Sequence, residues 1–88
     1  INIYLADTQD SLDQMVRAVN RLDFESLKKI AHKIKSSSAN IGARPLSRQA
    51  QTIESNPASS DIDVRLSSLR QEYDQVRDAL TRLDVKTL

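Results

Sequence analysis

Apolar residues recur at helical spacing in four separate stretches of the chain. The first stretch runs from about Asn2 to Arg21, and its apolar residues are spaced as on the buried stripe of a bundle helix. This pattern predicts a helix with Ile3 outside the buried stripe. The residues expected on the stripe are Leu5, Leu12, Met15, Val16, Val19 and Leu22.

A second helix is predicted from about Phe24 to Ile41. Asp23 is placed to cap its start, because a carboxylate there accepts a hydrogen bond from a free backbone N–H of the first turn. Gly42 is placed to end it, since glycine readily adopts the left-handed conformation at a helix C-terminus. The small Ser38 should permit close approach of another helix. The expected buried stripe consists of Leu27, Ile30, Ala31, Ile34, Ser38 and Ile41.

A third, shorter helix is predicted from about Pro45 to Ser55. Proline suits the first turn of a helix, where its missing N–H is not needed. Asn56 and Pro57 should end this helix, because a residue that precedes proline disfavours the helical conformation. The expected apolar face is narrow and consists of Leu46, Ala50 and Ile53.

The fourth helix is predicted to begin near Ser60 or Asp61 and to end at about Leu83. Its other face carries many charged residues, which is typical of a solvated helix surface. The last four residues, 85–88, are expected to form a frayed tail. The expected apolar stripe consists of Ile62, Leu66, Leu69, Tyr73, Val76, Leu80 and Leu83.

Four amphipathic helices with short connections predict an all-α fold, an antiparallel four-helix bundle. A chain of 88 residues is long enough for one small domain, so the bundle should span residues 1–88. The same pattern also occurs in coiled-coil oligomers. Pro45, Pro57 and the short turns disfavour that alternative.

Composition excludes several classes of protein. The chain has no cysteine and one histidine, which argues against disulfides and against thiolate or histidine-rich metal sites. Its net charge of +1 argues against a dedicated nucleic-acid binder. There is no apolar run of membrane-spanning length and no signal-peptide pattern at the start, so we expect a cytoplasmic protein without direct membrane contact. The first residue is Ile1 rather than methionine, which favours a fragment of a longer protein.

The single histidine, His32, is expected on the outer face of the second helix. At about 100° per residue, its side chain lies roughly 140° from the centre of the buried stripe. A buried position in the hydrophobic core is therefore disfavoured for His32. Its helical neighbours are Lys28, Lys35, Ser36 and Ala39. Phase and neighbours alone fit an idle surface histidine as well as a reactive one.

The segment from Ala31 to Ala43 resembles the signature of histidine-containing phosphotransfer (Hpt) domains, the phosphocarriers of multistep two-component relays. The signature has a small residue, the phosphorylated histidine, an aliphatic residue, a lysine, a glycine, small residues and a second glycine. Ser36 departs from it, because the family usually has glycine there to leave room for the imidazole and the docking receiver. The positions that match are His32, Ile34, Lys35, Ser38 and Gly42.

The resemblance implies a phosphorelay intermediate with the same helical architecture. His32 would accept a phosphoryl group from the aspartate of one receiver domain and pass it to another. Lys35 and Lys28 would neutralise the phosphoryl oxygens. Glu54 would accept a hydrogen bond from Nδ1, which fixes the tautomer and leaves Nε2 as the phosphorylated atom. The receiver would dock on the first and second helices, at Ser36, Ala39 and Ala43.

No nucleotide-binding loop, metal-binding carboxylate cluster or second general base accompanies the histidine, so we expect a phosphocarrier and not an enzyme. It would need no cofactor of its own, since the receiver would supply Mg²⁺ and the aspartate. We expect the domain to be a monomer. We also expect it to be one module of a larger hybrid sensor kinase.

Two alternatives stay open at this point. One is a structural or scaffolding bundle in which His32 has no function. The other is the dimerisation and phosphoacceptor domain of a sensor kinase. That class usually has an acidic residue directly after the histidine, where this chain has Lys33.

Overall fold

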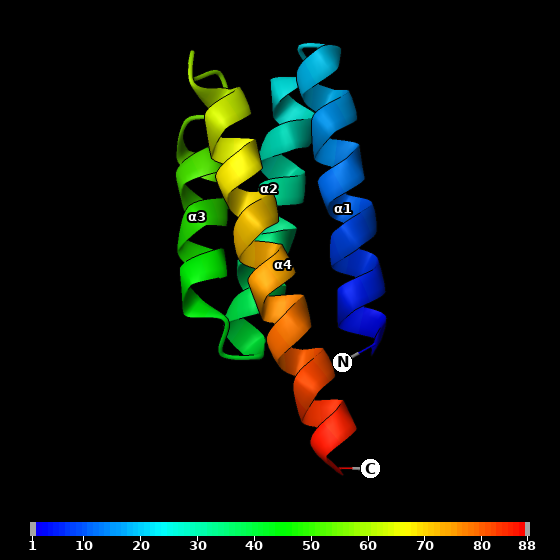
Figure 1. Ribbon diagram of the computed structural model, residues 1–88. Helices are drawn as coiled ribbons and strands as arrows, with labels where there is room; N and C mark the ends of the chain where they lie inside the picture. Colours follow the sequence, from blue (N-terminus) through cyan, green and yellow to red (C-terminus); the bar gives the residue numbers. More distant parts are fainter. Residues whose placement is uncertain (1, 88) are drawn as a thin grey trace.

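The computed structural model describes the backbone of residues 2–87 and the side chains of residues 2–82. The described residues form the helices α1 (Asn2–Asn20), α2 (Phe24–Asn40), α3 (Arg44–Ser55) and α4 (Ile62–Thr87). Consecutive helices run antiparallel, with α2 behind α4 and with α1 and α3 on either side (Figure 1). The prediction of an all-α, antiparallel four-helix bundle is confirmed.

The core draws on all four helices. The closest packing is between α2 and α3, where Ala31 and Ala50 are completely buried and bring the two backbones together. Ser38 is also completely buried, as predicted, and its hydroxyl forms a 2.9 Å hydrogen bond with the hydroxyl of Tyr4 on α1. The buried apolar residues are Leu12, Met15, Ala18, Leu27, Ala31, Ile34, Leu46, Ala50, Ile53, Ile62, Leu69 and Tyr73.

The turn between α1 and α2 combines a C-terminal and an N-terminal cap. The N–H of Leu22 donates to the carbonyl of Val19 at 3.0 Å, and the N–H of Asp23 donates to the carbonyl of Ala18 at 2.8 Å. This pair of bonds is a Schellman motif. Asp23 then caps α2, as predicted, because its carboxylate accepts from the N–H of Ser26 at 3.1 Å.

The turn between α2 and α3 repeats the Schellman motif. The N–H of Gly42 donates to Ala39 at 3.1 Å, and the N–H of Ala43 donates to Ser38 at 2.9 Å. Gly42 has a φ of 81°, the left-handed conformation expected for it. The corresponding residue of the first turn is Leu22, with a φ of 57°. Proline lies in the first turn of α3, as predicted.

Three residues predicted to be buried are exposed instead: Leu22 by 71%, Val16 by 40% and Ile41 by 40%. Leu22 and Ile41 lie beyond the last residues of their helices, so helical phase no longer determines their direction. Val16 lies at the edge of the α1 stripe and is incompletely covered. Ile3 is 79% exposed, in agreement with its predicted position off the stripe.

The predicted end of the fourth helix was wrong. The helix continues to Thr87, beyond both Leu83 and the predicted start of a frayed tail. No glycine or proline occurs in residues 83–87 to stop it. The predicted burial of Leu83 and the end of the tail at Leu88 lie outside the described residues. Because of this long helix, the molecule measures 44 × 20 × 19 Å, and α4 extends beyond the rest of the bundle (Figure 1).

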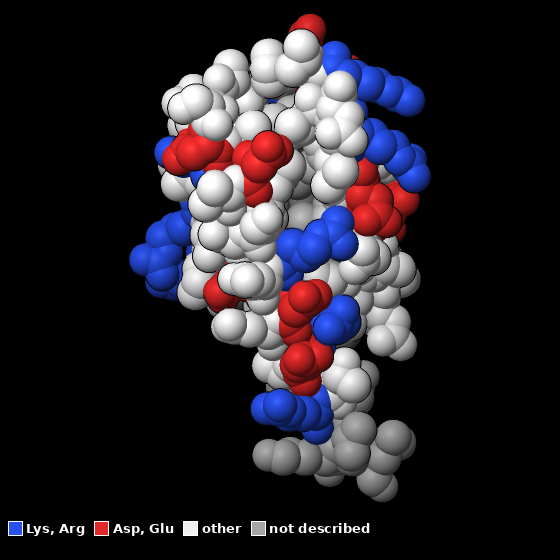
Figure 2. Space-filling view, turned by 45° about the horizontal axis from the view of Figure 1, so that its top comes forward, with Lys and Arg blue, Asp and Glu red and all other residues white. Residues whose placement is uncertain are grey.

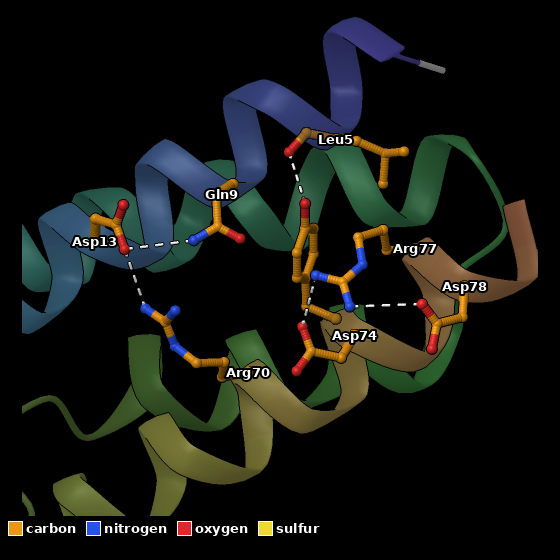
Figure 3. Close-up of polar contacts among 8 residues, drawn as sticks. Leu5, Gln9, Asp13, Arg70, Asp74, Arg77 and Asp78 are labelled. Carbon is orange, nitrogen blue, oxygen red and sulfur yellow. Dashed lines mark hydrogen bonds and ion pairs between the residues drawn. The ribbon is translucent and has the colours of Figure 1, made fainter. Parts of the chain in front are cut away.

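Polar contacts join α4 to α1. The hydroxyl of Tyr73 donates to the backbone carbonyl of Leu5 at 2.8 Å, and Arg70 forms a 3.2 Å ion pair with Asp13 (Figure 3). Burial raises the pKa of the Tyr73 hydroxyl. Acidic and basic side chains are interspersed on the face that Figure 2 shows. None of the described helices is long and apolar enough to span a membrane.

Candidate functional site

The imidazole of His32 lies on the outer surface of α2. Its side chain is 60% exposed, as its helical phase predicts. Ile34, on the opposite side of the helix from His32, is buried in the core, so the histidine sits on a well-packed element. An exposed ring on a rigid helix is accessible to a large partner.

Glu54, in the last turn of α3, lies beside the ring. Its Oε2 is 2.5 Å from Nδ1 of His32. A carboxylate only accepts hydrogen bonds, so Nδ1 carries the proton and donates it. Nε2 is then the nitrogen with a free lone pair. The close packing of α2 on α3 is what brings together two residues that are 22 positions apart in the chain.

Lys35 binds the other oxygen of the same carboxylate. Its Nζ donates to Oε1 of Glu54 at 2.6 Å. Glu54 is therefore held between Lys35 and His32, and its side chain is only 17% exposed. The hydrogen bond from Lys35, with a smaller contribution from His32, holds the pKa of Glu54 below its ordinary value of 4.5. In the sequence analysis Lys35 was expected to neutralise a phosphoryl group, but here its ammonium is paired with Glu54.

Ser47 on α3 fixes the register of this contact. Its hydroxyl donates to the backbone carbonyl of Lys35 at 2.8 Å. Ser47 and Glu54 are seven residues apart on α3, so they lie on the same face of that helix. Ser47 was not among the site residues predicted from the sequence. Its seven-residue spacing from Glu54 predicts that both lie on one helix face, but this gives only a weak indication of a contact with α2.

An open cavity of about 460 Å³ lies next to the imidazole, towards the start of α2. Lys28, expected near the histidine, lines it. Lys29 lines it too, although it was not among the site residues predicted from the sequence. Lys29 lies three residues before His32, a spacing at which helical side chains are neighbours. The lining residues are Glu25, Lys28, Lys29, His32 and Glu54.

The residues expected at the docking surface lie towards the end of α2. Ser36 and Ala39 are exposed on the side of the helix that carries His32, whereas Ala43 is half-buried in the turn and packs against the core. The neighbouring Ser37 donates its hydroxyl to the backbone carbonyl of Lys33 at 3.0 Å. The hydroxyl of Ser36 makes no hydrogen bond within the part of the chain that the structure describes.

Comparison with known proteins identifies the family. The family model of the Hpt domain matches residues 1–84, which is nearly the whole chain. Nothing among curated proteins or solved structures matches the chain. Hpt domains are phosphocarriers of two-component signalling, and receiver domains of response regulators are the partners that the family suggests. The chain belongs to the Hpt domain family, and its function is phosphotransfer in two-component signalling.

Proposed function

We propose that this domain is a phosphorelay intermediate that carries the phosphoryl group on Nε2 of His32. It accepts the group from the aspartyl phosphate of one receiver domain and passes it to the aspartate of another. One observation carries the proposal: an exposed imidazole whose Nδ1 is held by Glu54 at 2.5 Å, which leaves Nε2 free on the outer surface.

The transfer is a substitution at phosphorus. The lone pair of Nε2 forms the new N–P bond while the P–O bond to the receiver's aspartate breaks, and the aspartate leaves as a carboxylate. The proton on Nδ1 stays in place, so the phosphorylated ring carries a positive charge. The ionised carboxylate of Glu54 stabilises that charge. The same steps in reverse deliver the phosphoryl group to the next receiver.

In this proposal Lys35 is a positioning residue. Its ammonium is bound to Oε1 of Glu54 and orients the carboxylate towards the ring. Lys28 remains available in the cavity beside His32, where it can neutralise phosphoryl oxygens as a point charge.

The domain supplies only the nucleophile and its supports. Within the described residues, no three His, Cys, Asp or Glu side chains are grouped to hold a metal ion. We propose that Mg²⁺ and the aspartate come from the receiver, which docks beside His32 over the exposed Ser36 and Ala39. Such a transient interface is small, and the domain acts as a monomer.

Phosphotransfer from labelled receivers tests the proposal. The domain is mixed with Mg²⁺ and a panel of ³²P-labelled receiver domains, and acid-labile, base-stable label on the domain is followed. Since His32 is the only histidine, label of this stability on the wild type reports on that one imidazole. We expect label on the wild type and none on His32→Gln.

The control variant is Lys33→Gln, which changes the residue next to His32 but leaves the imidazole and Glu54 intact. It should accept label. A wild-type domain that takes no label from any receiver would favour the structural bundle with an idle histidine.

A further inference from the structure

Two lysines lie on either side of His32 on α2, one turn closer to the start of the helix. Relative to His32, Lys28 is rotated by about 40° in one direction and Lys29 by about 60° in the other. Side chains of an α-helix lean towards its N-terminus, so the imidazole leans into the space between the two lysines. The cavity beside the ring is lined by both of them.

The third lysine near His32, Lys35, already has its ammonium bound to a carboxylate. Lys35 is one turn closer to the end of α2, and its Nζ is bound to Glu54 at 2.6 Å. In contrast, neither Lys28 nor Lys29 forms an ion pair within the part of the chain that the structure describes. Both are exposed and have flexible stems. A new anion beside the ring would therefore meet these two ammonium groups first.

We propose that Lys28 and Lys29 together form a clamp for the phosphoryl group on Nε2 of His32, with Lys29 as a second phosphoryl-binding residue of the site. This inference rests on the proposed function and assigns a role to a residue that the sequence motif does not contain. The phosphoryl group occupies the cavity beside the ring, with one ammonium on each side. Lys35 holds Glu54 and does not contact the phosphoryl oxygens.

Glu25 also lines the cavity and belongs in the charge balance. It lies seven residues before His32, about 10 Å along the helix axis, but only three and four residues before the two lysines. Its carboxylate is therefore closer to Lys28 and Lys29 than to the phosphoryl position. It balances part of the lysine charge in the unphosphorylated domain without occupying the place of the phosphoryl group.

The pKa of the phosphoryl group itself tests the clamp. Nearby cations stabilise the dianion, so they lower the pKa at which the bound dianionic phosphoryl group takes up a proton and becomes a monoanion. The domain is phosphorylated chemically with phosphoramidate, so that no receiver is needed, and the ³¹P chemical shift is followed against pH. Phosphoramidate donates its phosphoryl group to Nε2 and releases ammonia.

We expect the phosphoryl pKa to rise by about half a pH unit in Lys29→Gln, by a similar amount in Lys28→Gln, and further in the double variant. The matched control is Lys33→Gln, which loses the same charge on the same helix. Lys33 faces the groove between α1 and α2 and lines it with Ile3 and Tyr4. This variant should titrate close to the wild type.

A Lys29→Gln variant that titrates like Lys33→Gln would overturn the clamp. This result is distinguishable from failure of the proposed function, because chemical loading does not depend on receivers. If the wild type takes label from receivers but Lys29→Gln and Lys33→Gln titrate alike, the relay role stands and the clamp does not. If no receiver donates label to the wild type or accepts it from the chemically loaded domain, the relay role fails.

Discussion

At the scale of single residues, Glu54 uses both of its oxygens within the site, one on His32 and one on Lys35. An amide at this position would present a donor to one partner and an acceptor to the other. A carboxylate can accept from both cationic and neutral donors at once. The arrangement therefore depends on Glu54 being ionised, and acid should disrupt it.

The first prediction concerns the pH dependence of stability. The folded-state pKa of Glu54 is below its ordinary value of 4.5, so Glu54 stabilises the fold above pH 4.5 and this contribution is lost as the pH falls through the lowered value. Glu54→Gln should lower the melting temperature near neutral pH. Its difference from the wild type should shrink in acid. Thermal melts from pH 7 to pH 2.5 measure this difference, and a gap that does not depend on pH would contradict it.

The second prediction concerns Ser36, which stands one turn after His32 in place of a small glycine. Ser36→Gly should accelerate phosphotransfer a few-fold, because it clears space for the receiver. It should also destabilise the domain by roughly 0.5 kcal/mol, because glycine is the poorer helix former. Transfer rates and urea unfolding measure the two effects. Ser37→Gly is the matched control: it should lose stability without any gain in rate, and an equal gain would refute the crowding argument.

At the scale of secondary structure elements, the α1–α2 and α2–α3 turns have the same hydrogen-bond pattern but a different kind of residue at the left-handed position. Both close with a Schellman motif, and the left-handed position is occupied by Gly42 in one turn and by Leu22 in the other. The left-handed conformation costs an ordinary L-residue roughly 1–2 kcal/mol. The first turn is therefore strained, and the second is not.

The third prediction follows from this difference. Leu22→Gly should stabilise the domain by about 0.5–1 kcal/mol, since it relieves the strain but adds freedom to the unfolded chain. Little packing is lost, because Leu22 is 71% exposed. Leu22→Ala, which keeps the strain and removes the side chain, should change stability little. Urea unfolding compares them, and equal stabilities for the two variants would disprove the strain argument.

Local signals in the sequence predicted the helices well. Asp23, Gly42 and Pro45 each act through the nearest backbone groups, so their effects were visible without the fold. Leu22 shows the limit, because its apolar side chain continues the helical pattern whereas its backbone has already left the helix. A pattern of side chains does not show that a turn forces an apolar residue into the left-handed conformation.

The candidate site likewise has features that the sequence predicts and features that only the packed structure determines. The exposure of His32 follows from phase, and the contact of its ring with Glu54 agrees with what the family resemblance implied. The pairing of Lys35 with Glu54 depends on the distance between α2 and α3, which periodicity does not give. The cavity that Lys29 lines depends on the direction in which the imidazole leans, and this is again a property of the packed structure.

At the scale of the whole molecule, α1 is attached to its two neighbours in different ways. The hydroxyl of Ser38 binds Tyr4 across the contact with α2. On the other side, the contact with α4 is the smaller one. It relies on the hydrogen bond from Tyr73 to the carbonyl of Leu5 and on the ion pair between Arg70 and Asp13 (Figure 3).

The fourth prediction concerns the packing of α1 on α4. Tyr73→Phe leaves the half-buried carbonyl of Leu5 without its second hydrogen bond and should cost about 1 kcal/mol. Amide hydrogen exchange should accelerate along α1 more than along α2 and α3. Tyr4→Phe is the comparison, since it removes a hydroxyl from the contact with α2. Uniform acceleration over all helices in Tyr73→Phe would mean that α1 does not open separately.

The orientation of His32 by residues of its own domain bears on the direction of signalling. Because Glu54 and Lys35 hold the ring within the domain itself, a donor and an acceptor of the proposed relay would meet the same surface. Under the proposed relay role, the ring orientation itself would then not distinguish the donor from the acceptor. The net flow of phosphoryl groups would be decided by the receivers, through the stability of each aspartyl phosphate and the abundance of charged and empty receivers, and an excess of empty receivers upstream would drain the relay backwards.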